Sequence, residues 1–404
     1  MNAKTSVTLA LYLQYFLFAI LLNSVGIVIL KVQNQYGVAP VDASLLELFK
    51  DLPIAIVSFL VASLLPRMGY KNSMLLGLAL TIVGAAIMYL GRSFLAAKLL
   101  MLCVGAGFAF VKVSVYASVG LVTEGEKAHN SLMSNVEGVF MLGIASAYFL
   151  FPAFQTETPD SWLNIYLFLG SLSAVAILFI QRTLRFPDGQ LASLQDAPDL
   201  GGMLKMMALP LVLVFVASAF FFVMVEQGIM TWLPTFNNDV LHLDEAQSIY
   251  MASILAISLG LGRFAAGWAV RYIRWSSLLL ICLTLAMLMV VFVLPFAVVA
   301  KAQAEWPLVL GVPLAAFLFP LIGLFIAPVY PLLASTVLSV IPKAEQAAMT
   351  GLIIVFSALG GTLGSRIIAY FFEREGGGAF YFTLLPMVLL MLGIVLLRRM
   401  TARA

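Results

Sequence analysis

Twelve long apolar runs follow one another along this chain, and they limit its possible folds more than any other feature. A helix needs about 20 residues to cross about 30 Å of hydrocarbon, and the runs reach about that length. Apolar residues make up 63% of the chain and charged residues 10%, whereas water-soluble domains hold about 45–50% and about 25%. The sequence therefore predicts an all-α membrane protein with twelve transmembrane helices, at about 7–32, 43–65, 73–92, 98–122, 130–152, 162–181, 208–232, 246–270, 276–299, 307–338, 346–371 and 379–397.

A polar stretch near the middle of the chain separates the first six runs from the last six. It is too short and too polar to bury a core of its own, so it is interpreted as a loop. We predict an N-terminal six-helix bundle at 1–182, a cytoplasmic linker loop at 183–206 and a C-terminal six-helix bundle at 207–404.

Two of the runs have special features. The first follows Lys4, is too long for the core of a signal peptide and has no small-residue cleavage site, so we expect it to remain as a spanning helix. The tenth run is long and rich in proline, which predicts a break or a kink. Its prolines are Pro313, Pro320, Pro328 and Pro331.

Lysine and arginine fall mostly on one side of the predicted helices. If the N-terminus is cytoplasmic, thirteen of them lie in cytoplasmic loops and ends, and five lie on the opposite side. Positive residues are enriched on the cytoplasmic side of membrane proteins, so both termini and the linker are expected there. We expect a multi-pass protein of a bacterial inner membrane that acts as a monomer.

Several classes of function are disfavoured by what the sequence contains. The net charge of +3 is spread over the loops without a basic block for nucleic acid, and Cys103 and Cys282 both lie in apolar runs. The two histidines, His129 and His242, have no metal-site spacing. The sequence has no protease, esterase or nucleotide-binding motif. We therefore predict a protein that is not an enzyme and that uses no cofactor or metal.

The two halves of the chain resemble each other. Ala62 is followed by a basic turn with Arg67 and Lys71, and Gly267 is followed about 205 residues later by one with Arg271 and Arg274. Duplicated six-helix halves form one large class of transporters. The two sets of six helices, the polar central loop and these basic turns resemble the major facilitator superfamily over the whole chain.

That resemblance implies the major facilitator fold of two pseudo-symmetric six-helix bundles. The superfamily's signature after the second helix is modified here, because Pro66 stands for its aspartate and Tyr70 for one of its arginines. Three further stretches resemble the fucose–galactose–glucose:proton symporter group and its relatives. They are 220–233 with Glu226 and Gln227, 260–267 with Arg263, and 130–138 with Asn135 and Glu137.

The chain also departs from those sugar symporters. The first helix has no carboxylate, and the fourth carries Lys112 instead of their Glu-Thr-Ala pattern. The resemblance implies proton-coupled transport of a small polar solute such as a sugar. Lys112 points instead to an organic anion, and both alternatives stay open.

Eight charged side chains fall within the apolar runs. Each costs about 2.5–3.5 kcal/mol inside a span, so we expect them to pair or to face water. They are Glu47, Lys50, Asp51, Lys112, Glu137, Glu226, Arg263 and Arg366.

Glu47, Lys50 and Asp51 are spaced so that they share one face of the second helix. They form either part of a proton path or outer gate, or a self-neutralising cluster at the helix mouth. Arg366 in the eleventh run is assigned to the same coupling or gating group. Several glycines lie near it in the sequence, and these glycines could instead serve only close helix packing.

Lys112 and Glu137 lie at similar depth in neighbouring helices, counted back from their shared cytoplasmic turn. We expect an ion pair that either exchanges partners during transport or permanently locks the two helices. Lys112 is also a candidate ligand for a carboxylate or phosphate of the substrate.

Glu226 and Gln227 lie in the outer part of the seventh run, followed by Thr231 and Trp232. The carboxylate, amide and aromatic ring suit a solute rich in hydroxyl groups or a cationic one. Alternatively, Trp232 anchors the helix at the interface and Glu226 is a rim residue, while Arg263 is interpreted as structural. Further candidates for the substrate site are Gln14, Asn23, Asn135 and Tyr330.

These observations predict a secondary active transporter that is driven by protons and moves a small polar solute by alternating access. An alternative is proton-driven efflux of lipophilic compounds, which the 30 phenylalanines and 19 methionines would suit. A second alternative is a sensor that does not transport, but such a protein usually carries a soluble output domain.

Overall fold

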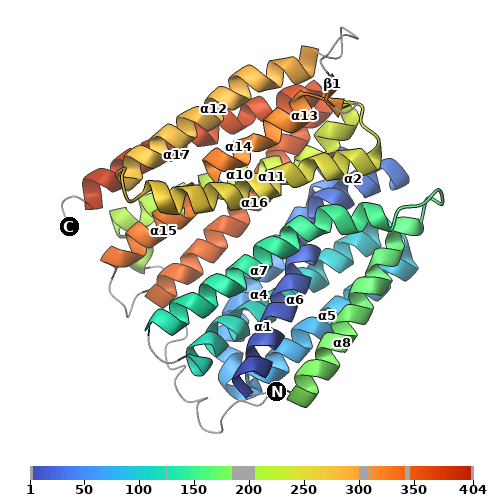
Figure 1. Ribbon diagram of the computed structural model, residues 1–404, viewed down its shortest axis with the longest axis vertical. Coiled ribbons are helices and arrows are strands. Elements are labelled where there is room, and N and C mark those ends of the chain that lie inside the picture. Colours follow the sequence, from blue (N-terminus) through green and yellow to red (C-terminus); the bar gives the residue numbers. More distant parts are fainter. Residues whose placement is uncertain are drawn as a thin grey trace. The chain divides into compact units, whose positions relative to one another are not determined.

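The computed structural model is almost entirely helical (Figure 1). It describes residues 3–123, 126–183, 205–299, 308–309, 312–341 and 346–401. The chain divides into two compact units, which are Met1–Gly37 with Leu46–Ala197, and Val38–Leu45 with Pro198–Ala404. The short segment Val38–Leu45 thus belongs to the second unit, although it lies inside the predicted bundle 1–182. Most of the predicted linker lies outside the described residues.

The first unit contains the helices that were predicted from the first six apolar runs. They are α1 (Ala3–Asn23), α2 (Val25–Tyr36), α4 (Leu45–Met68), α5 (Tyr70–Gly91), α6 (Phe94–Val122), α7 (Glu126–Ala153) and α8 (Asn164–Thr183), with a short 3-10 turn at η1 (Ser161–Leu163). Helices α1 and α2 belong to one apolar span and are interrupted only at Ser24, whose hydroxyl donates to the carbonyl of Leu21 at 2.8 Å. The first run therefore forms one interrupted helix.

The second unit contains the other six runs and the segment Val38–Leu45. Its helices are α3 (Pro40–Ala43), α10 (Pro210–Asp239), α11 (Glu245–Ala269), α12 (Trp275–Val299), α13 (Ala315–Leu318), α14 (Ile322–Ile326), α15 (Val329–Val340), α16 (Gln346–Glu375) and α17 (Leu384–Thr401). Short 3-10 turns occur at η3 (Phe319–Leu321) and η5 (Gly376–Thr383). Two short strands, β1 (Leu308–Val309) and β2 (Val312–Pro313), pair antiparallel.

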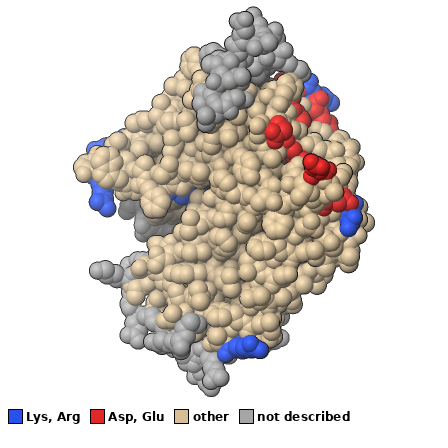
Figure 2. Space-filling view, turned by 45° about the vertical axis from the view of Figure 1, so that its right-hand side comes forward, with Lys and Arg blue, Asp and Glu red and all other residues tan. Residues whose placement is uncertain are grey.

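The predicted number of spanning helices is confirmed in the described part of the chain. Ten candidate spans are long and apolar enough to cross a membrane, and one of them, Gly351–Thr401, contains both α16 and α17. Dividing that span at η5 and adding α4 gives twelve. Most of the face shown in Figure 2 carries no charged side chain, as a lipid-facing surface requires.

The predicted break in the tenth run is also confirmed. The run folds into α13, η3, α14 and α15 in place of one continuous helix. Pro320 lies in η3, and Pro328 is the residue before α15. Proline has no backbone N–H and its ring clashes with the preceding turn, which explains why regular helix stops at these positions.

Glycine allows several helices of each unit to pack closely. A Cβ on Gly77 of α5 would lie 2.6 Å from the carbonyl oxygen of Gly107 of α6, and a Cβ on Gly105 would meet the carbonyl of Lys50 in α4. In the second unit, a Cβ on Gly360 of α16 would meet the carbonyl of Phe220 in α10. These glycines have a packing role, as small residues do in membrane helices.

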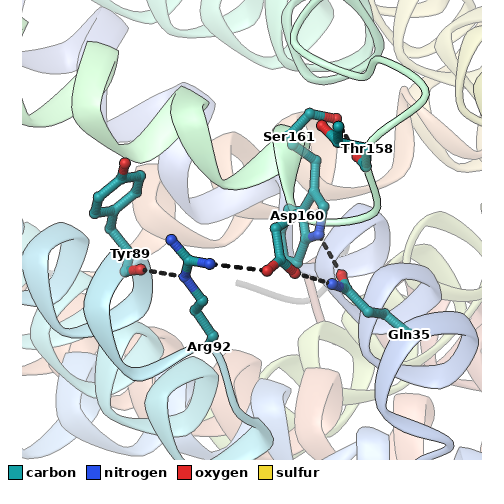
Figure 3. A network of polar contacts seen from close by, with 7 residues as sticks. Gln35, Tyr89, Arg92, Thr158, Asp160 and Ser161 are labelled. Carbon is teal, nitrogen blue, oxygen red and sulfur yellow. Dashed lines mark hydrogen bonds and ion pairs between the residues drawn. The ribbon is translucent and has the colours of Figure 1, made fainter.

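A polar network holds one end of the first unit together (Figure 3). Asp160 pairs with Arg92 at 2.9 Å and accepts a hydrogen bond from the amide of Gln35, while the buried indole of Trp162 donates to the Gln35 oxygen. Arg92 also donates to the carbonyl of Tyr89 at 3.3 Å. The network therefore connects the ends of α2 and α5 to the turn before α8.

Candidate functional site

One charged site within the first unit is formed by α6 and α7. Lys112 lies ten residues before the end of α6 at Val122, and Glu137 lies eleven residues after the start of α7 at Glu126. At 1.5 Å per residue, both lie about 15–17 Å from the shared turn, which is about half of the hydrocarbon thickness. The hydroxyl of Tyr116, one turn after Lys112, donates to Oε1 of Glu137 at 2.7 Å.

The predicted direct ion pair between Lys112 and Glu137 is absent. Both residues are in the described part of the chain, and their charged atoms do not approach within 4.0 Å. Tyr116 instead provides the close contact of Glu137. The Lys112 ammonium lies over the rings of Phe108 and Tyr116, at 5.6 and 5.8 Å from their centroids.

Aromatic rings from three helices surround this arrangement. Tyr15 of α1 lies 5.4 Å from Phe140 of α7, 6.1 Å from Phe108 and 6.2 Å from Tyr116, measured between ring centroids. Phe108 lies 5.9 Å from Phe140 and 5.8 Å from Phe18. We call Tyr15, Phe108, Tyr116 and Phe140, together with Lys112 and Glu137, the α6–α7 site.

The local sequence explains how this site forms. Phe108, Lys112 and Tyr116 follow one another at four-residue spacing and therefore share one face of α6. Glu137 and Phe140 are three residues apart and share one face of α7 in the same way. The rings were not predicted as part of the site, although the spacing of Phe108 and Tyr116 around Lys112 was a signal that could have found them.

A second cluster of charges lies on α4. The Lys50 ammonium contacts Glu47 at 2.5 Å and Asp51 at 3.5 Å, and the three side chains are only 5%, 0% and 12% exposed. The predicted shared face is therefore confirmed. One lysine between two carboxylates leaves a net charge of −1 when all three are ionised. We call these residues the α4 triad.

The second unit has a charged site of its own. Glu226 of α10 pairs with Arg263 of α11 at 3.6 Å, and their side chains are 15% and 37% exposed. Phe222, one turn before Glu226, stacks on Tyr330 at 5.8 Å between centroids. Arg263, which we interpreted as structural, thus holds a predicted site residue. Gln227 is partly buried beside Glu226.

One expectation for α10 is wrong, and so is one of the two alternatives that were left open for it. Glu226 lies near the middle of the helix instead of in its outer part, because α10 continues to Asp239 beyond the predicted end at 232. Trp232 is completely buried and donates to the Ser365 hydroxyl at 3.0 Å, so it is not an interfacial anchor. The helix continues through Pro234 because a neighbouring helix, α16, packs along it.

Arg366 has a defined partner in the second unit. Its guanidinium donates to the carbonyl of Val41 at 3.0 Å and contacts the hydroxyl of Ser44 at 3.4 Å. Glu373, also on α16, accepts from the backbone N–H of Val41 at 3.2 Å. Two charged side chains therefore attach the short helix α3 to α16, which is the only role visible for Arg366 within the described residues.

The uncharged candidates from the sequence are not brought together. Gln14 is fully buried and donates to the carbonyl of Ala10 at 3.0 Å, and Asn23 donates to Ala19 at 2.9 Å. Asn135 is exposed, and its position two residues before Glu137 places it on a different face of α7. Within the described residues, no group of three histidine, cysteine or acidic side chains could hold a metal ion.

Comparison with known proteins gives one family and several similar structures. The family model described as Major Facilitator Superfamily matches residues 11–365. A search of curated proteins gives no match. The crystal structure of the Escherichia coli fucose:proton symporter FucP is similar, with a TM-score of 0.65 and 14% identity, covering 98% of this chain and 99% of FucP.

Two other solved structures also share the fold. A bacterial homologue of the human lysosomal transporter Spinster has a TM-score of 0.72 and 15% identity, covering 99% of this chain and 96% of its own. The nucleoside transporter NupG has a TM-score of 0.74 and 14% identity, covering 98% of this chain and 100% of NupG. At such identities, the likeness concerns the fold and not the solute.

Proposed function

Since this chain belongs to the Major Facilitator Superfamily, whose members are multi-pass membrane transporters and not enzymes, we propose that it is a proton-coupled secondary transporter. In this proposal it moves a small polar solute, a sugar or an organic anion, across a bacterial inner membrane by alternating access. Both termini lie in the cytoplasm, as the thirteen-to-five distribution of lysine and arginine favours.

The α6–α7 site is the observation that carries the proposal. A lysine and a glutamate at about mid-depth of two spanning helices are costly, because inserting each charged side chain into the membrane costs about 2.5–3.5 kcal/mol of free energy. The Tyr116–Glu137 hydrogen bond and the two rings near Lys112 offset some of this cost. Charges inside membrane spans are commonly retained for substrate or ion pathways, which supports a transport role for this pair.

Coupling to protons rests on acidic side chains inside the spans. Glu137 belongs to the α6–α7 site, and Glu47 and Asp51 belong to the α4 triad. A carboxylate that gains a proton changes its charge by one, which alters both its pairing and its tolerance of a low-dielectric environment. The chain carries no nucleotide-binding motif, so an ion gradient is the energy source that we propose.

Reconstitution into proteoliposomes that contain a pH-sensitive dye tests the function. Addition of a transported solute outside should acidify the lumen, and an uncoupler should abolish the signal. A panel of neutral sugars, small carboxylates and lipophilic cations covers the candidate solutes. Lys112→Ala should abolish the signal, whereas Lys98→Ala should keep it. Lys98 lies in the same helix and also contacts aromatic rings, so it is a matched control.

The outcomes separate the two candidate functions. Sugar- or carboxylate-driven proton entry supports the proposal. Lipophilic cations that drive protons in the opposite direction would replace it with proton-driven efflux. An unchanged signal in Lys112→Ala would remove the α6–α7 site from the mechanism.

A further inference from the structure

The α6–α7 site offers a cation without a close anionic partner. Among the described residues, no carboxylate lies within 4.0 Å of the Lys112 ammonium, and its recorded neighbours are the rings of Phe108 and Tyr116. The Lys112 residue is partly buried. Ring faces attract a cation more weakly than a carboxylate does. The site can therefore still accept an anionic group.

The aromatic rings near Lys112 contact one another. The rings of Tyr15, Phe108 and Phe140 lie 5.4–6.1 Å apart between centroids, and Phe18 extends the group at 5.8 Å from Phe108. Such spacings are those of aromatic rings in offset or tilted contact. A planar apolar group beside Lys112 would find similar contacts here.

A neutral sugar finds few partners in the same place. A neutral sugar is bound through many hydrogen bonds, but the amide groups of Gln14 and Asn23 donate to their own helix backbone. Asn135 lies on a different face of α7 from Glu137. A lipophilic cation would be repelled by Lys112. Among the candidate solutes, an anion fits the charges and the rings together.

The charge balance connects the anion to a proton. Within the described residues of the first unit, the charged and titratable groups near Glu137 are Tyr116 and Lys112 from α6 and Tyr15 from α1. With Lys112 protonated and Glu137 ionised, the pair is neutral, and a bound monoanion would leave a net charge of −1. Protonation of Glu137 restores neutrality. An anion and a proton therefore favour each other's binding, which is the reciprocity that thermodynamic linkage requires.

We infer that the solute is a monocarboxylate or similar anion with a planar apolar portion. Its anionic group binds Lys112, and its planar portion lies against Phe108 and Phe140. Glu137 takes up one proton when this anion binds. This inference rests on the proposed function and names the substrate class of the same site. Glu137 exchanges only a proton with solvent, and no bond of the solute is broken.

Thermal unfolding of the purified full-length protein tests the inference, with benzoate and phenylacetate as probes. Acetate, glucose and tetraphenylphosphonium serve as comparators at pH 5.5 and 7.5. We expect the aromatic carboxylates to raise the midpoint by about 3 °C or more at saturation, with a larger shift at pH 5.5. Acetate should give a smaller shift, and glucose and the cation should give none.

Variants make the test specific to the site. Lys112→Ala should lose the benzoate shift, Lys112→Arg should keep part of it, and Lys98→Ala should keep all of it. Glu137→Gln should keep the shift and make it equal at the two pH values, because the amide stays neutral. The inference is overturned if Lys112→Ala keeps the benzoate shift, or if neither aromatic carboxylate stabilises the wild-type protein.

The same probes in proteoliposomes separate this inference from the proposed function. Proton entry driven by glucose but not by benzoate would overturn the inference and leave the proton-coupled transporter intact. Benzoate binding without any solute-driven proton movement would overturn the coupling of anion and proton, and with it the proposed function.

Discussion

Tyr116 donates a hydrogen bond of 2.7 Å to Oε1 of Glu137, and the Lys112 ammonium lies over the ring of the same tyrosine. One tyrosine side chain therefore contacts both opposite charges. The arrangement joins α6 to α7 through a neutral hydroxyl.

Removal of that hydroxyl tests its role. Tyr116→Phe keeps the ring over which Lys112 lies and deletes only the hydrogen bond to Glu137. Hydrogen bonds to charged groups contribute about 1.5–3 kcal/mol, so we expect a lower unfolding midpoint and at least tenfold slower solute-driven proton entry. Tyr89→Phe, at the far end of α5, is the matched control and should change neither value.

The α4 triad should depend strongly on its lysine. Lys50→Met leaves Glu47 and Asp51 buried without a cation, and breaking a buried ion pair from one side costs about 3–5 kcal/mol. We expect a large fall in the thermal unfolding midpoint in detergent. The triple variant Glu47→Gln, Lys50→Met, Asp51→Asn should recover much of it, because no uncompensated charge remains. Equal midpoints for Lys50→Met and wild type would contradict this account.

Close helix packing predicts that alanine lowers stability at Gly105 but not at Gly138. In Gly105→Ala the new methyl group would meet the carbonyl of Lys50, and overpacking of this kind costs about 1–3 kcal/mol or more. In Gly138→Ala the methyl group meets nothing within 4 Å. Expression level and unfolding midpoint should therefore fall for Gly105→Ala alone. A similar fall in both variants would contradict the packing account, and helix propensity could not explain it, because alanine favours a helix more than glycine does.

The attachment of α3 to α16 is accessible to hydrogen exchange. Arg366→Ala removes the donor to the Val41 carbonyl, and Glu373→Ala removes the acceptor of the Val41 amide. We expect the amides of α3 to exchange several-fold faster in each variant, because local opening needs fewer bonds to be broken. Arg374→Ala changes a residue that stacks on Tyr370 instead, and it should leave α3 unchanged.

The sequence by itself determined where the helices lie and which charges they carry. Long apolar runs must become helices in lipid because every backbone polar group has to be satisfied within its own segment, so hydrophobicity alone located them. Spacing within one helix was equally readable, since Glu47, Lys50 and Asp51 share a face whatever surrounds them. The break at the prolines of the tenth run followed from the chemistry of one residue type.

Tertiary structure decided what each charge contacts across helices. Counting residues along the sequence places Lys112 and Glu137 at equal depth in the membrane. The rotation of each helix about its axis decides whether their side chains meet, and no local sequence pattern encodes that rotation. The result is Tyr116 beside Glu137, and Arg263 beside Glu226. The extent of α10 past Pro234 was decided in the same way, because packing against α16 outweighs the local preference of proline.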